Sequence, residues 1–546
     1  MLYLMVFAPF LAAFLMFAAS GKDSRSASRL AVILSSALFV ASIALLVSGD
    51  YAMPIEWFRI PVVDDPVVLN FATNPFPFAT NGFASWMVFL ASIITLAALI
   101  ASRNTPGVNY RNFAIGMFVQ LGALNGTFLA VDAVVFFFFF EALVLPAAFL
   151  IGSYGGPGKR PAALHFALYT LIGSAPMAVA LWYLISLGGS SHMFLIAKEA
   201  QNLSETTQTV LFWCFVLAFW VKTPLFPLHG WLAETYAEAP AGLSAVLTGS
   251  MSKAGVYGFF WCIAIFPAVA FENAKLLMGL GLFTAVYGAL MAMRAKDIKK
   301  LLAFSSMGHL GLAVAGIFTL FAEMFPVVLV MLVGHGLSAA ALFILSGSAE
   351  RFAGSRLLSK MGGYARLHPV FAFFFGVACV LAIAIPGTVG FVGEFLVLFC
   401  LWNASKIAAI VASVVIVLSA VYMLRLIRQV LFGECPETET SGECTQARFP
   451  ALEAVATAPL LILLIFFGIH PAPIMGTLEY SNDEDALRTE EIEAAIAAAI
   501  PAEPENSEVA SEVALDTILK QEMVVGKDSV ETVVLEAKQV EDENVR

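Results

Sequence analysis

Six ionisable side chains lie within long apolar stretches of this sequence, and they are its most informative residues. They are Glu141, Lys222, Lys253, His309, His335 and Glu394. Ionisable groups inside membrane-spanning segments are rare and usually mark proton or ion pathways. Histidine titrates near physiological pH, so it can take up a proton from one neighbour and release it to another. These residue types together predict stepwise proton transfer across a membrane.

Each of these residues also has a purely structural interpretation. Glu141, which follows five phenylalanines, could stay protonated or bond to backbone, and Lys222 could extend from the end of its span to the lipid headgroups. Lys253 lies about midway along its apolar stretch, so a structural role there would require a buried carboxylate partner. Lone histidines on packed helices often serve only as core residues, so the structural interpretation is strongest for the two histidines.

Proline and glycine interrupt two of the apolar stretches beside a charge. Lys222 is followed by Pro224 and Pro227, and the run PGTVGFVGE ends at Glu394. Proline removes a backbone donor and clashes with the preceding turn of a helix. A broken helix at membrane depth is tolerated only where it lines protein interior or a wet cavity. Paired interrupted helices in the two halves of a transporter point to its ion site, so both stretches are predicted to be broken helices on an ion pathway.

Composition places the chain in a membrane. It has 546 residues, of which 60% are hydrophobic and 13% are charged, against roughly a quarter charged in soluble domains. Since a spanning helix needs about 20 mostly apolar residues, hydropathy predicts an all-α polytopic membrane protein with about fourteen such helices. They are expected at roughly 1–19, 30–48, 83–101, 113–131, 133–151, 162–187, 208–229, 240–266, 275–293, 299–320, 325–347, 369–401, 406–431 and 452–470. The first is long enough to span and has no basic region before it, so it is expected to be retained rather than cleaved as a signal peptide.

The order of these helices predicts a repeat and an orientation. The two broken helices are the seventh and twelfth, which predicts two inverted five-helix repeats, helices 4–8 and 9–13. Five of the odd-to-even connections are basic, and that between helices 7 and 8 has no basic residue. Under the positive-inside rule these connections are cytoplasmic. Both termini are then expected on the periplasmic side of a bacterial inner membrane.

The net charge of −11 belongs to the C-terminal region. Residues 479–546 hold 19 acidic and 5 basic side chains, whereas the rest of the chain is slightly basic. We therefore expect a membrane domain over residues 1–471 and an acidic tail over 472–546 that is disordered or a loose surface helix. Nothing in this charge distribution suggests nucleic-acid binding.

Several collinear motifs carry a resemblance to a known family. VKTPLFPLHGWL, EAPAGLSAVLTGSMSKAGVYG, DIKKLLAFSSMGHLGLAVAGIF, GHGLSAAALF and PGTVGFVGEF resemble the antiporter-like subunits of proton-pumping NADH:quinone oxidoreductase, respiratory complex I. The resemblance covers residues 110–430, the expected proton-translocation core. It is strongest to the subunit M type, in which helix 12 carries a glutamate, matched here by Glu394. Two departures are WLAETY where the family often has WLPDAH, and NGFAS at 81–85 in place of a DGIS-like motif.

The resemblance implies a role for each buried charge. Glu141 and Lys222 would form the pair of the first half-channel, with Lys253 as the link on helix 8. The two histidines would continue a hydrated axis to Glu394, the carboxylate on the exit side. Asp132, at the head of helix 5, resembles an acidic residue of the family with a weaker role.

The function implied is proton translocation driven by NADH oxidation and quinone reduction in other subunits. No haem, flavin, nucleotide-binding or hydrolytic motif is present, so this chain is expected to hold no cofactor, metal or redox site. NADH, FMN, iron–sulfur clusters and quinone are expected in partner subunits. The expected partners are other membrane-arm subunits, including related antiporter-like ones, with lipids and protons. The alternatives are a subunit of an Mrp-type Na⁺/H⁺ antiporter or membrane-bound hydrogenase, and a membrane scaffold whose charges only orient helices.

Overall fold

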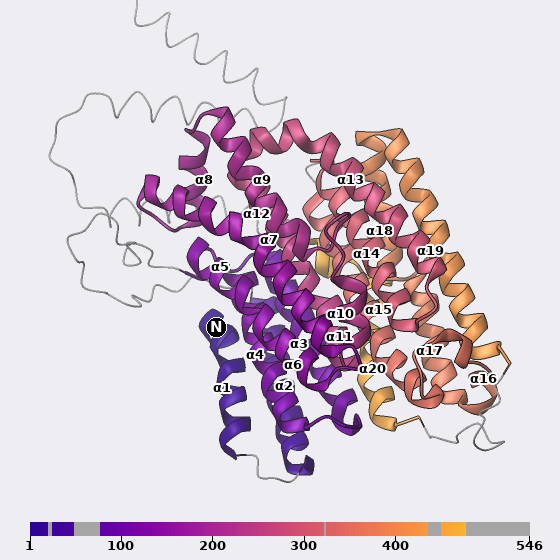
Figure 1. Cartoon of the computed structure of the whole chain (residues 1–546). Helices are drawn as coiled ribbons and strands as arrows, with labels where there is room; N and C mark the ends of the chain where they lie inside the picture. The colour runs from indigo at the N-terminus through magenta and orange to yellow at the C-terminus, as the bar shows by residue number, and fades with distance from the viewer. Residues whose placement is uncertain (20–23, 49–76, 321–323, 435–448, 477–546) are drawn as a thin grey trace, which may run out of the picture. The chain divides into compact units, whose positions relative to one another are not determined.

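The chain is built from α-helices (Figure 1). The computed structural model describes residues 1–19, 24–48, 77–320, 324–434 and 449–476. Over these ranges, pairing between extended segments is limited to isolated β-bridges. Ten helices of this part of the chain are long and apolar enough to cross a membrane. An all-α polytopic membrane protein is therefore confirmed, while most of the acidic tail lies outside the described residues.

The first helices form a packed group at the N-terminus. α1 and α4 lie against each other, and the Asn125 side chain of α4 donates to the Met5 carbonyl of α1 at 2.8 Å. Asn81 caps the next helix by accepting from the Ala84 backbone N–H at 2.7 Å, as asparagine commonly does at an N-cap. The helices are α1 (Leu2–Ala19), α2 (Ser24–Ser48), α3 (Gly82–Ala101), η2 (Ser102–Asn104) and α4 (Tyr110–Leu129).

In the middle of the chain, the expected spans 133–151 and 240–266 are each divided into more than one helical segment. The helices of this part are α5 (Ala133–Ala142), α6 (Val144–Tyr154), α7 (Lys159–Gly188), α8 (Met193–Gln201), α9 (Glu205–Lys222), α10 (Leu232–Glu238), α11 (Ala241–Val246), the wide π-turn η3 (Leu247–Met251) and α12 (Ser252–Ile265). The remaining helices are α13 (Pro267–Arg294), α14 (Ile298–Ile317), α15 (Met324–Ala353), η4 (Leu358–Lys360), α16 (Tyr364–Leu367), α17 (Pro369–Ala382), α18 (Val389–Ala404), α19 (Lys406–Phe432) and α20 (Ala451–Ile469).

Both predicted helix breaks are present. α9 ends at Lys222, two residues before a proline, and the expected helix at 369–401 is divided between α17 and α18. In that second break Gly387 has a positive φ of 92°, a conformation that glycine adopts without steric cost. The sequence did not predict two further interruptions, the junction of α5 and α6 at Leu143 and the π-turn η3.

Loops that are distant in sequence meet at one end of the bundle. The Gly156 N–H donates to the Glu238 carbonyl at 2.9 Å, and the Ile298 N–H donates to the Arg356 carbonyl at 3.0 Å. The α6–α7, α10–α11 and α13–α14 connections and the segment after α15 are therefore on the same side. Asp132 and His192 form a bridge at the other end of the α5–α6 span, so successive connections alternate between the two ends.

Glycines bring α13 and α14 into backbone contact. A Cβ added at Gly281 of α13 would lie 2.9 Å from both Ala315 N and Gly311 O of α14. Small residues at such positions let membrane helices approach closely, so that their backbones pack directly. The apolar stretch of α15 is entirely buried, which makes α15 a central helix against which others pack.

We predict that Gly281→Ala destabilises the protein and that Gly279→Ala, two residues away on the same helix, does not. The new methyl group at position 281 meets backbone atoms that cannot move aside, and overpacking of this kind costs ~1–3 kcal/mol. Gly279 has no heavy atom within 4 Å of the corresponding position. Thermal unfolding of the detergent-solubilised protein measures both. Equal midpoints for the two variants would show that the glycine contact is not needed.

Candidate functional site

Four of the six predicted site residues form one contiguous chain, which we call the relay. The Lys253 Nζ lies 2.9 Å from Nδ1 of His335. The rings of His335 and His309 stack with their centroids 5.2 Å apart and their planes 21° apart. His309 Nε2 then lies 3.1 Å from Oε1 of Glu394. An amine, two imidazoles and a carboxylate from α12, α15, α14 and α18 are thus brought together.

The π-turn η3 positions the first member of the relay. Lys253 lies two residues after this turn, and its Nζ also donates to the Thr248 carbonyl at 2.5 Å. The Thr248 hydroxyl is 2.7 Å from the Ser306 hydroxyl of α14, which ties the turn to a second relay helix. Short π-helical turns occur frequently at functional sites. The fully buried amine therefore has two acceptors, the Thr248 carbonyl and His335 Nδ1. It has no carboxylate partner, although a purely structural role for Lys253 would require one.

The contacts of the ring nitrogens indicate what each nitrogen of the two histidines can do. His309 Nδ1 lies 2.8 Å from the Ser305 carbonyl, and since a carbonyl only accepts, this nitrogen carries a hydrogen. Its Nε2 is left to exchange a proton with Glu394. His335 uses Nδ1 toward Lys253, and its Nε2 is buried without a hydrogen-bond partner.

A small cavity lies beside the end of the relay. It is lined by both histidines, Glu394 and the break between α17 and α18, and its volume is about 10 Å³. This is close to the smallest volume that holds one water, ~10–15 Å³. His335 Nε2 and Glu394 Oε2 are both buried without a partner, so the polar atoms available to such a water belong to residues that line this cavity.

Close backbone packing holds Glu394 at the relay. A Cβ at Gly393 would collide with the backbone of Met331 on α15, and one at Gly334 would lie 3.0 Å from Gly390 N. α18 therefore begins in direct contact with the helix that carries His335. The glycines that follow the predicted break thus serve the approach of two helices as well as the break itself.

Lys222 is buried and Glu141 is half-buried, and no ion pair joins them. Lys222 Nζ instead donates to the Phe140 carbonyl at 3.0 Å and lies 4.4 Å from the centroid of the Phe140 ring. Both Glu141 carboxyl oxygens are buried without a hydrogen-bond partner. Successive residues of a helix project about 100° apart, so bonding to residue 140 does not bring the lysine to the side chain of residue 141. Lys222 of α9 therefore contacts the residue that precedes Glu141 on α5, and no hydrogen bond or ion pair joins its ammonium to the Glu141 carboxyl.

No hydrogen bond joins Lys222 to Lys253, the first residue of the relay, although their helices are in contact. α9 and α12 pack through Gly255, where a Cβ would lie 2.9 Å from Thr223 N. The hydroxyl of Thr223 is buried at this contact and has no hydrogen-bond partner. The sequence analysis did not single out Thr223, Thr248 or Ser306. Thr223 directly follows Lys222 and precedes a proline, so its position in the KTP run was the available signal.

Asp132 has a structural contact at the start of α5. Its Oδ1 accepts from the backbone N–H groups of Val134 and Val135, each at 2.9 Å, and the Ser191 hydroxyl donates to its other oxygen. It is therefore an N-cap and does not reach the relay. Within the ranges that the structure describes, no three His, Cys, Asp or Glu side chains are grouped as metal ligands.

Relatives of known name match most of this chain. The family model described as NADH:quinone oxidoreductase/Mrp antiporter, TM, matches residues 130–419. NADH-quinone oxidoreductase subunit M of Rickettsia prowazekii is 31% identical over 469 residues, which cover 86% of this chain and 94% of the relative. The subunit M of Escherichia coli K12 is 29% identical over 490 residues, covering 87% and 95%.

Solved structures agree with the sequence matches. A chain of respiratory complex I from Thermus thermophilus with bound NADH superposes with a TM-score of 0.77 at 27% identity, covering 88% of this chain and 99% of that one. A chain of the Mrp complex from Dietzia has a TM-score of 0.74 at 21% identity, covering 87% and 96%, and this likeness shows the fold alone. The region matched by the family model contains all six ionisable residues of the apolar stretches, and the chain belongs to the NADH:quinone oxidoreductase/Mrp antiporter membrane family, with subunit M of NADH-quinone oxidoreductase among its relatives.

Proposed function

We propose that this chain is a proton-translocating membrane-arm subunit of NADH-quinone oxidoreductase. The observation that carries the proposal is the contiguous relay from Lys253 to Glu394, which offers proton donors and acceptors at 2.9 Å and 3.1 Å on either side of the histidine stack. The relatives are named as subunit M of NADH-quinone oxidoreductase, which indicates the reaction that drives proton transfer. The energy comes from NADH oxidation and quinone reduction in partner subunits, and this chain contributes the proton path.

Proton transfer along the relay has two direct steps and one indirect step. The Lys253 ammonium gives a proton to Nδ1 of His335, which releases the proton on its own Nε2. The stacked rings face each other without a bond between their nitrogens, so this proton leaves through a water in the adjoining cavity. The water delivers it to Oε2 of Glu394, and Oε1 of the same carboxyl exchanges a proton with Nε2 of His309. Each step moves one proton, and His335 must return to the tautomer with its hydrogen on Nε2 before Nδ1 can accept the next proton from Lys253.

The first half of the path works as a switch in this proposal. Lys222 is bonded to the carbonyl of Phe140. The next residue, Glu141, has a carboxyl group without a hydrogen-bond partner. Movement of the ammonium onto a Glu141 carboxylate at ~4 Å would stabilise the charged lysine by about 4 kcal/mol at an effective dielectric of ~20. A conformational change that makes or breaks this contact therefore controls whether the lysine passes its proton toward Lys253.

The finer architecture belongs to the same proposal. We infer about fourteen membrane crossings, with helices 4–8 and 9–13 as inverted repeats inside a membrane domain of residues 1–471. The corresponding positions of the break after Lys222 and the break before Glu394 support the repeat. The basic connections face the cytoplasm of a bacterium, and both termini face the periplasm. NADH, FMN, iron–sulfur clusters and quinone are bound by partner subunits, which include related antiporter-like chains.

We predict that Lys253→Ala lowers the ratio of protons translocated to NADH oxidised by the whole share of this subunit. The substitution removes the first donor of the relay, and loss of a positioned proton-transfer group slows such a step by roughly 10²-fold or more. The measurement is the initial rate of proton uptake by inverted membrane vesicles, divided by their rate of NADH oxidation. Lys275→Ala, at an exposed position of α13, is the matched control.

An unchanged ratio in assembled Lys253→Ala complex would overturn the relay and support a scaffold role for the buried charges. Purification of the complex separates the remaining alternatives. NADH-oxidising and quinone-reducing subunits should accompany this chain. Recovery with Mrp-type or hydrogenase subunits instead would assign the same relay to a different machine.

We predict that single cysteines at positions 160 and 202 are labelled from opposite sides of the membrane. Arg160 starts α7 beside a basic turn, Asn202 follows α8 at the other end, and both are exposed. The native chain has six cysteines, so both variants are made in a chain whose cysteines are replaced by alanine, and that chain is the blank. An impermeant maleimide should label Arg160→Cys in inverted vesicles and Asn202→Cys in right-side-out vesicles. Reversed labelling would contradict the orientation, and labelling from one side would contradict a single crossing by α7.

A further inference from the structure

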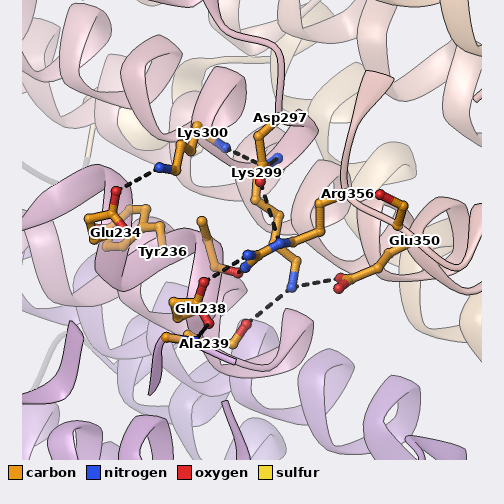
Figure 2. Close-up of polar contacts among 12 residues, drawn as sticks. Glu234, Tyr236, Glu238, Ala239, Asp297, Lys299, Lys300, Glu350 and Arg356 are labelled. Atoms are coloured by element: carbon orange, nitrogen blue, oxygen red, sulfur yellow. Dashed lines mark hydrogen bonds and ion pairs between the residues drawn. The ribbon is translucent and has the colours of Figure 1, made fainter. Parts of the chain in front are cut away.

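Five charged side chains from three separate stretches of the chain meet at the end of the bundle where the loops converge (Figure 2). We call this group the charged clasp, and its members are Glu238, Asp297, Lys299, Glu350 and Arg356. Lys299 Nζ lies 2.9 Å from Oε2 of Glu350, with 4% of the lysine side chain exposed. A guanidinium nitrogen of Arg356 lies 2.7 Å from Oε1 of Glu238, and its Nε lies 3.4 Å from Oδ2 of Asp297.

Backbone groups complete the clasp. Lys299 Nζ also donates to the Ala239 carbonyl at 3.1 Å, and Glu238 Oε2 accepts from the Gly158 N–H at 2.8 Å. Asp297 caps α14 by accepting from the N–H groups of residues 299 and 300 at 2.8 Å and 3.1 Å. Burial alone would lower the pKa of Arg356, but its bond to Glu238 and the nearby carboxylates raise it above the usual value. The clasp therefore binds side chains to the main chain at three helix ends.

Three of the segments that the clasp joins lead to a relay residue. From Ala239 the chain enters α11 and η3 and reaches Lys253. From Asp297 it runs along α14 to His309, which at 1.5 Å per residue is roughly 18 Å away. Glu350 is on α15, the helix that carries His335. Because helices transmit axial displacement along their length, a shift at the clasp changes the contacts between the members of the relay.

An adjacent ion pair provides a comparison. Lys300, the next residue along α14, lies 2.6 Å from Oε1 of Glu234, and the side chains are 36% and 52% exposed. Exposed pairs of this kind contribute little to stability. Lys299 differs because it is buried and contacts both the α10–α11 connection and the end of α15.

We propose that Lys299 and its clasp partners are positioning residues that set the spacing of Lys253, His335 and His309. This inference rests on the proposed function of the relay and adds its control from the loop end. The clasp touches no member of the relay. It fixes the starts of α11 and α14 relative to the end of α15, and thereby holds the transfer distances within the relay.

The test compares Lys299→Gln with Lys300→Gln in the assembled complex. The readout is proton uptake divided by NADH oxidation in inverted vesicles, at equal amounts of assembled complex. Lys299→Gln should lower this ratio toward that of Lys253→Ala, since a misplacement of 1 Å can slow a positioned transfer by about 10²-fold. Lys300→Gln should match the parent, and Lys299→Arg, which keeps the charge, should recover most of the lost ratio.

A double variant distinguishes positioning from a general loss of stability. If Lys299 acts through the relay, Lys299→Gln in a Lys253→Ala background should lower the ratio no further. A further loss in the double variant would overturn the proposal. So would a Lys299→Gln ratio equal to that of Lys300→Gln while Lys253→Ala remains defective. A normal ratio in Lys253→Ala itself would instead overturn the proposed function.

Glu350→Gln covers the case in which Lys299→Gln does not assemble. Glu350 is the partly exposed partner, with 36% of its side chain accessible, so its substitution leaves a lysine that still reaches the Ala239 carbonyl. The same lowered ratio is expected, with assembly retained. Parental pumping by assembled Glu350→Gln would contradict the clasp as a positioning device.

Discussion

The requirement that a buried ammonium have acceptors governs the arrangement of this protein. Lys253 is fully buried, and its partners are the Thr248 carbonyl and an imidazole nitrogen. A regular helix uses its carbonyls in its own hydrogen bonds, so acceptors for a buried charge are most available where the helix is irregular. Lys222 ends its helix and bonds to a carbonyl near the α5–α6 junction. Helix interruptions and buried charges therefore occur together for one physical reason.

The same coincidence explains what the sequence revealed. Proline and glycine leave a visible mark, so the breaks after Lys222 and before Glu394 were predictable, and low charge elsewhere made the six ionisable residues stand out. The π-turn η3 has no proline, and its geometry depends on contacts such as Thr248 with Ser306 of α14. The distance between Glu141 and Lys222 depends on side-chain direction, which residue type and spacing do not specify.

The charged clasp shows a second limit of sequence reasoning. Its residues lie in or beside connections whose charges indicate membrane orientation, and that interpretation accounts for them without any pairing. Arg356 and Glu238 are 118 positions apart, and Lys299 is distinguished from Lys300 only by burial. Tertiary packing decides which lysine is enclosed, so two adjacent identical residues acquire different environments.

The two halves of the proton path differ in how completely they are assembled. The relay from Lys253 to Glu394 is in contact, whereas Lys222 is joined neither to Glu141 nor to Lys253. A path connected throughout would let protons return down their gradient, so a pump needs at least one connection that opens and closes with its energy source. Under the proposed function, the unmade contacts around Lys222 are where that control acts. The buried, unpartnered hydroxyl of Thr223 lies at the contact between α9 and α12, the helices that carry the two lysines this control must connect.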